Sequence, residues 1–151
     1  MTYKMQMSNL DISPSKTCFL CVSPDYSSVV AQHLSHGLSQ DGEIYHIEAV
    51  NVPFPDESET EYAQVFARRI AEWQQEWDSF VLIEAGVIRG GNYTWITDIM
   101  EESGATNYYT VALCENIRSR FKSDFVSLYY NNDMHDLHFW WERPNNHWKF
   151  P

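Results

Sequence analysis

Cysteine is scarce in this 151-residue chain, and its three positions do not form a disulfide framework. Cys18 and Cys21 have a C-x-x-C spacing, but they lie in the apolar run KTCFLCV, which we expect to be a strand. Successive side chains of a strand alternate between its faces, so this spacing places the two thiols on opposite faces. Cys114 lies in another apolar run with no second cysteine nearby. The sequence therefore predicts three buried structural thiols.

Long apolar runs and positive charge are also lacking. No run approaches the roughly 20 residues needed to span a bilayer, and the N-terminus has no charged segment followed by an apolar core. Only 10 residues are Lys or Arg against 21 Asp or Glu, a formal net charge of −11. General binding to nucleic acid or to an anionic membrane needs basic side chains that displace counterions from phosphates. We expect a cytoplasmic protein without either activity, in which a local basic pocket is still allowed.

The remaining composition is that of one globular domain. Of the 151 residues, 44% are hydrophobic and 15% are aromatic, enough for a sizeable core. Residues 1–15 show no clear periodicity, so we expect a tail or short arm there. A single α/β domain is expected over residues 16–151.

Apolar runs alternate with amphipathic stretches along this domain. Strands are expected over residues 17–22, 43–50, 80–84 and 109–115, with one or two more between 125 and 148, and helices follow the first three, most clearly over 59–77. This alternation is typical of a parallel sheet covered by helices, which binds ligands outside the carboxyl ends of its strands. We therefore expect an α/β fold with a mainly parallel sheet of four or five strands.

The stretch FVLIEAGVIRGGNYTWI carries the strongest functional signal. The bulky apolar residues 80–83 suit a strand buried on both faces, with a buried helix as the alternative. Gly90 and Gly91 allow positive φ angles and close approach of a ligand. Asn92 or Thr94 is expected to cap the helix that follows.

A strand, a glycine turn and a helix in succession form a potential anion site. Free N–H groups at a helix N-terminus, together with the positive end of the helix dipole, favour a phosphate above such a turn. Glu84, at the carboxyl end of the expected strand, is placed to accept hydrogen bonds from sugar hydroxyls. The alternative is a tight strand–helix connection that binds nothing.

The segment EAGVIRGGN resembles a degenerate form of the phosphoribosyl-diphosphate loop of type I phosphoribosyltransferases. In that family an apolar strand leads into two acids, two small apolar residues and a T/D-T-G-G-T turn. Glu84 matches the first acid, Ala85 replaces the second, and the two glycines keep their positions. The resemblance implies that Glu84 is catalytic and holds the ribose hydroxyls. It implies a 5′-phosphate turn made of Ile88, Arg89, Gly90, Gly91, Asn92, Tyr93 and Thr94.

Two later segments resemble those of purine phosphoribosyltransferases. SRFKSDFVSLYY is similar to the family's (Y/F)KPD(F/Y)V segment, and LHFWWERP is similar to its fPWE segment, with Trp141 and Glu142 matching and Trp140 in place of proline. The first of these similarities implies base-binding residues at Lys122, Phe125 and Val126. Without the family, the tryptophans are equally compatible with packing or with an interface.

In this family, the loop after the first strand contacts the diphosphate, often with a basic residue. The corresponding residues here are Ser23, Pro24, Asp25 and Tyr26. None of them is Lys or Arg, so this loop departs from the family's pattern, as Ala85 does.

Together these segments imply a phosphoribosyltransferase-like protein, of the kind that acts in purine salvage. It would bind phosphoribosyl diphosphate or a nucleotide and transfer a purine-type base with weak activity, using Mg²⁺. We expect no metal to be held by the protein alone, because His135 and His138 would face opposite sides of a strand. A homodimer is a further expectation. The alternative is a non-catalytic domain of the same fold that binds a ribose phosphate, a nucleotide or a partner protein.

Overall fold

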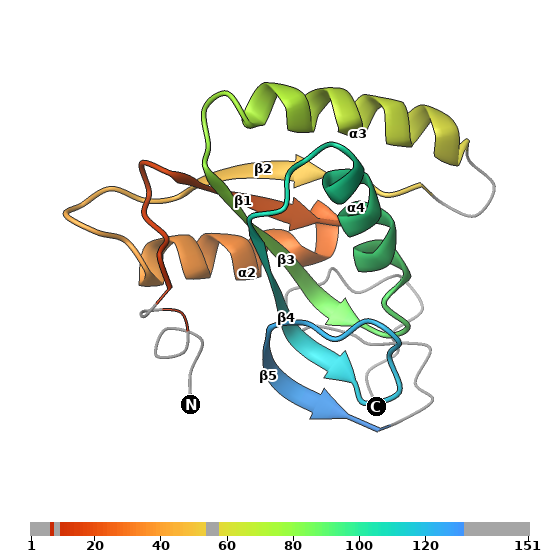
Figure 1. The fold of residues 1–151 in the computed structure, drawn as a ribbon. Helices are drawn as coiled ribbons and strands as arrows, with labels where there is room; N and C mark the ends of the chain where they lie inside the picture. Colours follow the sequence, from red (N-terminus) through yellow and green to blue (C-terminus); the bar gives the residue numbers. More distant parts are fainter. Residues whose placement is uncertain (1–6, 8–9, 54–57, 132–151) are drawn as a thin grey trace.

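The computed structural model describes residues 7, 10–53 and 58–131. Strands and helices alternate along the chain (Figure 1). The elements are β1 (Thr17–Val22), α2 (Pro24–Gly37), β2 (His46–Val50), α3 (Glu59–Trp73), β3 (Ser79–Val87), α4 (Gly91–Glu102), β4 (Tyr108–Asn116) and β5 (Phe125–Tyr130).

The five strands form one sheet in the order β2-β1-β3-β4-β5, and every neighbouring pair is parallel. The prediction of a mainly parallel sheet of four or five strands is confirmed. From β1 the chain moves outward to β2 and then returns past β1 to β3. The carboxyl ends of β1 and β3 therefore lie side by side where the strand order reverses, the usual position of a ligand site in open α/β sheets.

Helices cover both faces of the sheet. Figure 1 shows α2 on one face and α3 and α4 on the other, and each face has its own apolar cluster. Within β1, Cys18 belongs to the cluster under α3 and α4, whereas Cys21 belongs to the cluster under α2. Both thiols and that of Cys114 are buried and free, as predicted.

Local sequence signals explain where several helices and strands begin and end, and some of these ends differ from the predicted ones. Helix α3 begins after Ser58, whose hydroxyl accepts a hydrogen bond from the N–H of Glu61, and it ends at Trp73 rather than at residue 77. Strand β2 begins at His46 rather than at residue 43, and Glu43 instead pairs with Gln40 across a turn with positive φ at Asp41 and Gly42. Gly104, at φ 78°, follows the end of α4, as expected for a helix terminator.

The expected N-terminal arm is described in part. Met7 and Ile12 are buried in the cluster under α2. None of the helices in the described ranges has the length and apolar character required to span a bilayer.

Candidate functional site

A cavity of about 350 Å³ lies at the carboxyl end of β3, where the chain turns into α4. Its lining residues are Glu84, Gly86, Val87, Ile88, Arg89, Gly90, Gly91 and Asn92. Five of the seven residues predicted for the 5′-phosphate turn are in this lining, together with the predicted acid Glu84. Tyr93 and Thr94 follow in the first turn of α4.

The predicted succession of strand, glycine turn and helix is present. Strand β3 continues past Glu84 to Val87, and α4 begins at Gly91, one residue earlier than expected. Gly90 has φ 83°, and a Cβ there would lie 2.4 Å from the Cβ of Phe121. Gly91 has ordinary helical geometry, and a Cβ there would meet no atom within 4 Å. Gly90 is therefore required by the backbone, whereas Gly91 leaves open space at the helix start.

The expectation that Asn92 or Thr94 caps α4 is wrong. The N-cap residue is Gly90, which has no side chain to cap the helix. The Asn92 amide instead donates to Oε1 of Glu84 over 2.7 Å, and the Thr94 hydroxyl donates back to the carbonyl of Gly90. Because the N-cap residue offers no capping side chain, an anion in the cavity faces the positive end of the α4 dipole.

Glu84 is the acid of this cavity. It is 6% exposed, and burial raises the pKa of its carboxyl group to about 7, although the hydrogen bond from Asn92 acts in the opposite direction. Near neutral pH the side chain therefore exists in both protonated and ionised forms. It can donate to a ligand oxygen in one form and accept from sugar hydroxyls in the other.

Ala85, which stands in the place of the family's second acid, faces away from Glu84. It is buried in the cluster under α2, and its N–H donates to the hydroxyl of Ser27 over 2.9 Å. Successive side chains of β3 point to opposite faces of the sheet. An acid at position 85 would therefore enter the apolar cluster rather than the cavity.

The predicted diphosphate loop lies at the carboxyl end of β1, next to that of β3. Ser23 has a left-handed φ of 50° and donates its N–H to the carbonyl of Val50. Asp25 and Tyr26 are exposed, and Pro24 is half-buried. None of the four residues lines the cavity. Their contact with a ligand is still a prediction.

The structure does not bring the three predicted base-binding residues together. Val126 pairs with Ala112, which in turn pairs with Glu84, so Val126 lies in the same row of the sheet and on the same face. Phe125 faces the α2 side, where its ring lies 6.3 Å from that of Tyr109. The Lys122 ammonium group donates to the carbonyl of residue 117. Only Val126 shares a face with Glu84, and the roles of all three residues are still predictions.

Sequence reasoning missed the packing of the β4–β5 loop on the glycine turn. The N–H of Arg120 donates to the carbonyl of Arg89 over 3.4 Å, and the ring of Phe121 lies 5.1 Å from that of Tyr93. The Tyr93 hydroxyl donates to carbonyls of β3 and β4, which fixes the start of α4 on the sheet. The contacts of Arg120 and Phe121 join residues about 30 positions apart, and the two hydrogen bonds of Tyr93 span 11 and 18 positions, so no local pattern indicates them.

Several residues named in the sequence analysis lie outside the described part of the chain. They are His135, His138, Trp140, Trp141 and Glu142. In the ranges that are described, no group of three His, Cys, Asp or Glu side chains could hold a metal ion.

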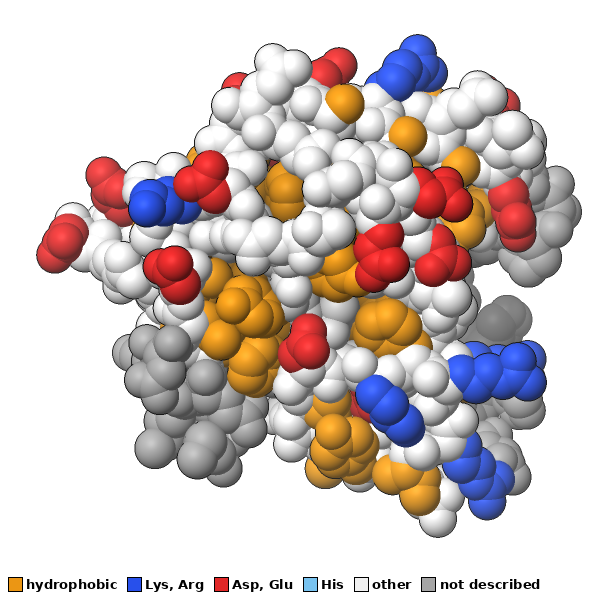
Figure 2. Space-filling model, in the orientation of Figure 1, with side chains coloured by type: hydrophobic (Ala, Val, Ile, Leu, Met, Phe, Trp, Pro, Cys, Tyr) orange, Lys and Arg blue, Asp and Glu red, His pale blue; other side chains and the backbone are white. Residues whose placement is uncertain are grey.

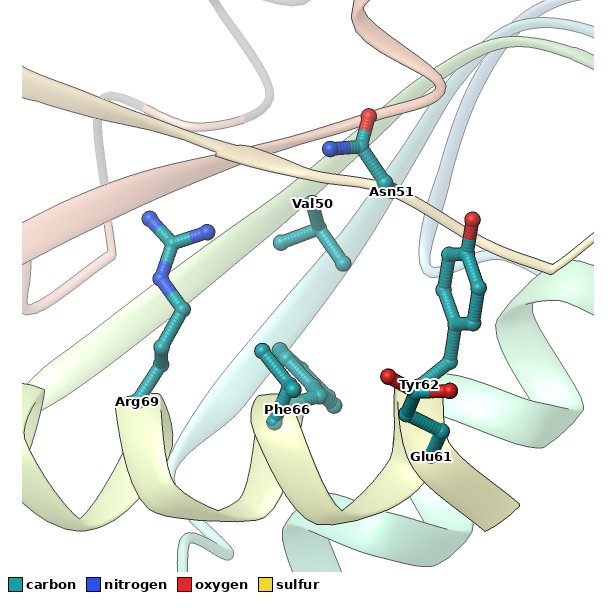
Figure 3. Close-up of a pocket in the computed structure, with 7 residues that line it drawn as sticks. Val50, Asn51, Glu61, Tyr62, Phe66 and Arg69 are labelled. Atoms are coloured by element: carbon teal, nitrogen blue, oxygen red, sulfur yellow. The ribbon is translucent and has the colours of Figure 1, made fainter. Parts of the chain in front are cut away.

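A second cavity of about 310 Å³ lies between the end of β2 and α3 (Figure 3). Its floor is apolar, with Val50 and Phe66, and Arg69 lies at one end. The Arg69 guanidinium donates to the carbonyl of Ala49 over 3.0 Å and pairs with Glu48 over 2.9 Å. The charge of Arg69 is therefore satisfied within the protein, and none of the residues predicted for function lines this cavity.

The pKa of Glu84 predicts how stability depends on pH. The folded protein holds its proton up to about pH 7, whereas the unfolded chain releases it near the ordinary pKa of 4.5. The resulting stabilisation is complete below pH 4.5 and is lost as pH rises to 7, a change of about 3 kcal/mol in the free energy of unfolding. In Glu84→Gln this loss disappears. Denaturant titrations at about pH 4.5 and 8 measure the free energy of unfolding of both proteins. Glu72→Gln, which changes an exposed acid, is the control. If the stability of wild type and Glu84→Gln changed with pH in parallel, the raised pKa of Glu84 would be contradicted.

The burial of Ala85 predicts that Ala85→Asp destabilises the fold. The carboxylate would enter an apolar cluster in which the hydroxyl of Ser27 is the nearby donor. We expect the free energy of unfolding to fall by at least about 2 kcal/mol at pH 8, and by less at pH 4 where the acid is protonated. Ala85→Ser is the matched polar control. An Ala85→Asp variant as stable as the wild type would show that position 85 has access to solvent.

No protein-family model and no curated protein matches the sequence. Three similar solved structures are described by their sequence identity, TM-score and coverage. A purine phosphoribosyltransferase from Pyrococcus horikoshii is 13% identical with a TM-score of 0.55, and the match covers 85% of this chain and 77% of that chain. A hypoxanthine phosphoribosyltransferase from Staphylococcus aureus is 10% identical with a TM-score of 0.59, covering 86% of this chain and 70% of that chain, and an HGPRT-ase from Leishmania tarentolae in complex with GMP is 12% identical with a TM-score of 0.59, covering 84% and 69%. At these identities the likeness concerns the fold. The chain has the α/β fold of the type I phosphoribosyltransferases.

Proposed function

We propose that this protein binds a ligand containing ribose 5-phosphate, either phosphoribosyl diphosphate or a nucleotide, at the turn between β3 and α4. The observation that carries this proposal is that one cavity contains both the start of α4, whose N-cap residue is a glycine, and the buried acid Glu84. The first offers N–H donors to a phosphate, and the second offers hydrogen bonds to sugar hydroxyls. The solved structure with GMP supports the same ligand class, because it shares this fold.

The proposed pose follows from the lining of the cavity. The 5′-phosphate lies in the open space beside Gly91, where an added Cβ would meet no protein atom within 4 Å. The ribose lies toward Glu84, whose orientation is fixed by the hydrogen bond from Asn92. Neither Ala112, which is fully buried, nor Val126 lines the cavity, so this pose assigns no position to the base.

We expect transfer of a base to phosphoribosyl diphosphate to be slow. The competing outcomes are hydrolysis of the bound ligand and binding without reaction. Glu84 is the only carboxyl group among the described residues that line the cavity, and position 85, an alanine that faces the opposite side of the sheet, supplies no second one. One charge-assisted hydrogen bond contributes about 1.5–3 kcal/mol, so its absence slows a reaction by roughly one to two orders of magnitude. The loop after β1 also supplies no Lys or Arg to neutralise a leaving diphosphate. These two features favour a non-catalytic binding domain as the second candidate function.

A magnesium ion enters this proposal with the ligand. The described residues contain no cluster that could hold a metal alone, and Glu84 is only partly ionised near neutral pH. Mg²⁺ prefers phosphate oxygens and water, with one or two protein carboxylates. It would therefore be held by a bound diphosphate, whose charge it would neutralise, and Glu84 is the carboxyl group that the cavity could offer it.

Gly91→Val tests the position of the phosphate. The new side chain would occupy the open space at the helix start, so we expect affinity for ribose 5-phosphate or a nucleoside monophosphate to fall at least tenfold in calorimetry. Gly37→Val is the matched control, because Gly37 lies at the far end of α2 and also has nothing within 4 Å. Unchanged affinity in a folded Gly91→Val protein would place the ligand elsewhere.

A diphosphate-release assay separates the two candidate functions. With phosphoribosyl diphosphate, Mg²⁺ and hypoxanthine, guanine, xanthine or adenine, we expect turnover to be slow or undetectable, although binding persists. Residual turnover should be lost in Glu84→Gln, which cannot ionise. Rapid turnover by the wild type would refute the expectation of a weakened catalytic site. Binding without turnover would support the alternative that this is a non-catalytic binding domain.

A further inference from the structure

Basic side chains are gathered beside the proposed phosphate turn. Only 10 of the 151 residues are Lys or Arg, yet Arg89, Arg118, Arg120 and Lys122 all belong to the two loops that meet there. Figure 2 shows basic side chains at the lower right of the molecule, over the carboxyl ends of β3, β4 and β5, while acidic side chains are spread over the upper half. In a protein of net charge −11, such a local concentration of positive charge is unexpected.

The two loops form one surface. A Cβ at Gly90 would lie 2.8 Å from the Ser119 hydroxyl and 2.9 Å from the Phe121 nitrogen, so the backbones touch. The N–H of Arg120 also donates to the carbonyl of Arg89. The backbone of Arg118 is fixed by its N–H, which donates to the side chain of Asn116 over 2.9 Å. The three arginines are therefore attached to backbone held against the turn.

The fourth cation has a different role. The Lys122 ammonium group donates to the carbonyl of Ile117 over 2.9 Å and lies 3.9 Å from Oε1 of the buried Glu115. Glu115 also accepts from the N–H of Ser123 over 2.9 Å. Lys122 and Glu115 thus hold the β4–β5 loop together, and Arg89, Arg118 and Arg120 are the other exposed cations of the cluster.

Two acids in the described part of the chain, Glu84 and Glu115, lie near these two loops. Glu84 is 6% exposed and lines the adjacent cavity. Glu115 lies beneath the loop, fully buried beside Lys122. Arginine suits phosphate better than lysine does, because its planar guanidinium donates two parallel hydrogen bonds to two oxygens of one group.

We propose that Arg89, Arg118 and Arg120 form a second anion subsite that binds the outer phosphates of a nucleoside 5′-di- or triphosphate. This inference rests on the proposed function, since it starts from a first phosphate at the start of α4. In the proposed function, the first phosphate accepts hydrogen bonds from N–H groups at the start of α4. Arg89 lines that same cavity, and the loop with Arg118 and Arg120 packs on the adjacent Gly90. A phosphate chain that continues from the first group therefore meets the arginines.

Calorimetry with AMP, ADP and ATP, at one ionic strength and without Mg²⁺, tests this subsite. In the wild type we expect affinity to rise at least tenfold from AMP to ATP, and the rise to shrink at higher salt. In the double variant Arg118→Gln, Arg120→Gln the rise should fall below threefold, while affinity for AMP changes less than twofold. Arg68→Gln, an exposed arginine on α3, is the control and should keep the full rise.

The outcomes separate this inference from the proposed function. If AMP binds and Gly91→Val abolishes that binding, but ATP binds no more tightly than AMP, the arginine subsite is overturned and the proposed function stands. A full rise in the double variant would likewise overturn the subsite. A third outcome is that inorganic triphosphate binds, whereas ribose 5-phosphate and all three nucleotides do not. That outcome would overturn both the proposed function and this ligand class.

Discussion

Burial of the central strands on both faces is the constraint on which the rest of this structure depends. In β1, all six residues are buried, and in β3 eight of nine are. A strand enclosed in this way cannot present polar side chains to solvent from its middle, because unpaired buried polar groups are costly. Chemistry is therefore confined to the carboxyl ends, where Glu84 is the first acid that β3 carries. The burial that forces this position also raises the pKa of Glu84.

The sequence was sufficient for the fold because the signals involved are local. Apolar runs indicated the strands, the three- and four-residue spacing of Phe66, Ile70 and Trp73 indicated the buried face of α3, and alternation of strand and helix indicated a parallel sheet. The position of the cavity was also predictable. A glycine pair after a buried strand indicates a turn into a helix, and Gly90 adopts the positive φ that such a turn requires.

Details of the site depend on contacts that no local pattern records. The choice between a cap and another role for Asn92 is decided by the proximity of Glu84, eight residues earlier. The direction of Ala85 is decided by the continuation of β3 to Val87, which keeps the side chains alternating through the position of the second acid. The need for glycine at position 90 comes from Phe121 in a different loop. Each of these is a consequence of the assembled sheet rather than of neighbouring residues.

The arrangement at β2 has a consequence for the behaviour of the protein in solution. This strand is at one edge of the sheet, and edge strands expose backbone groups that can recruit a strand from another molecule. Arg69 reaches from α3 to the carbonyl of Ala49 and to the side chain of Glu48. A bulky charged group thus occupies a hydrogen-bonding position along the edge. The same side chain that closes one end of a cavity also hinders edge-to-edge aggregation of the sheet.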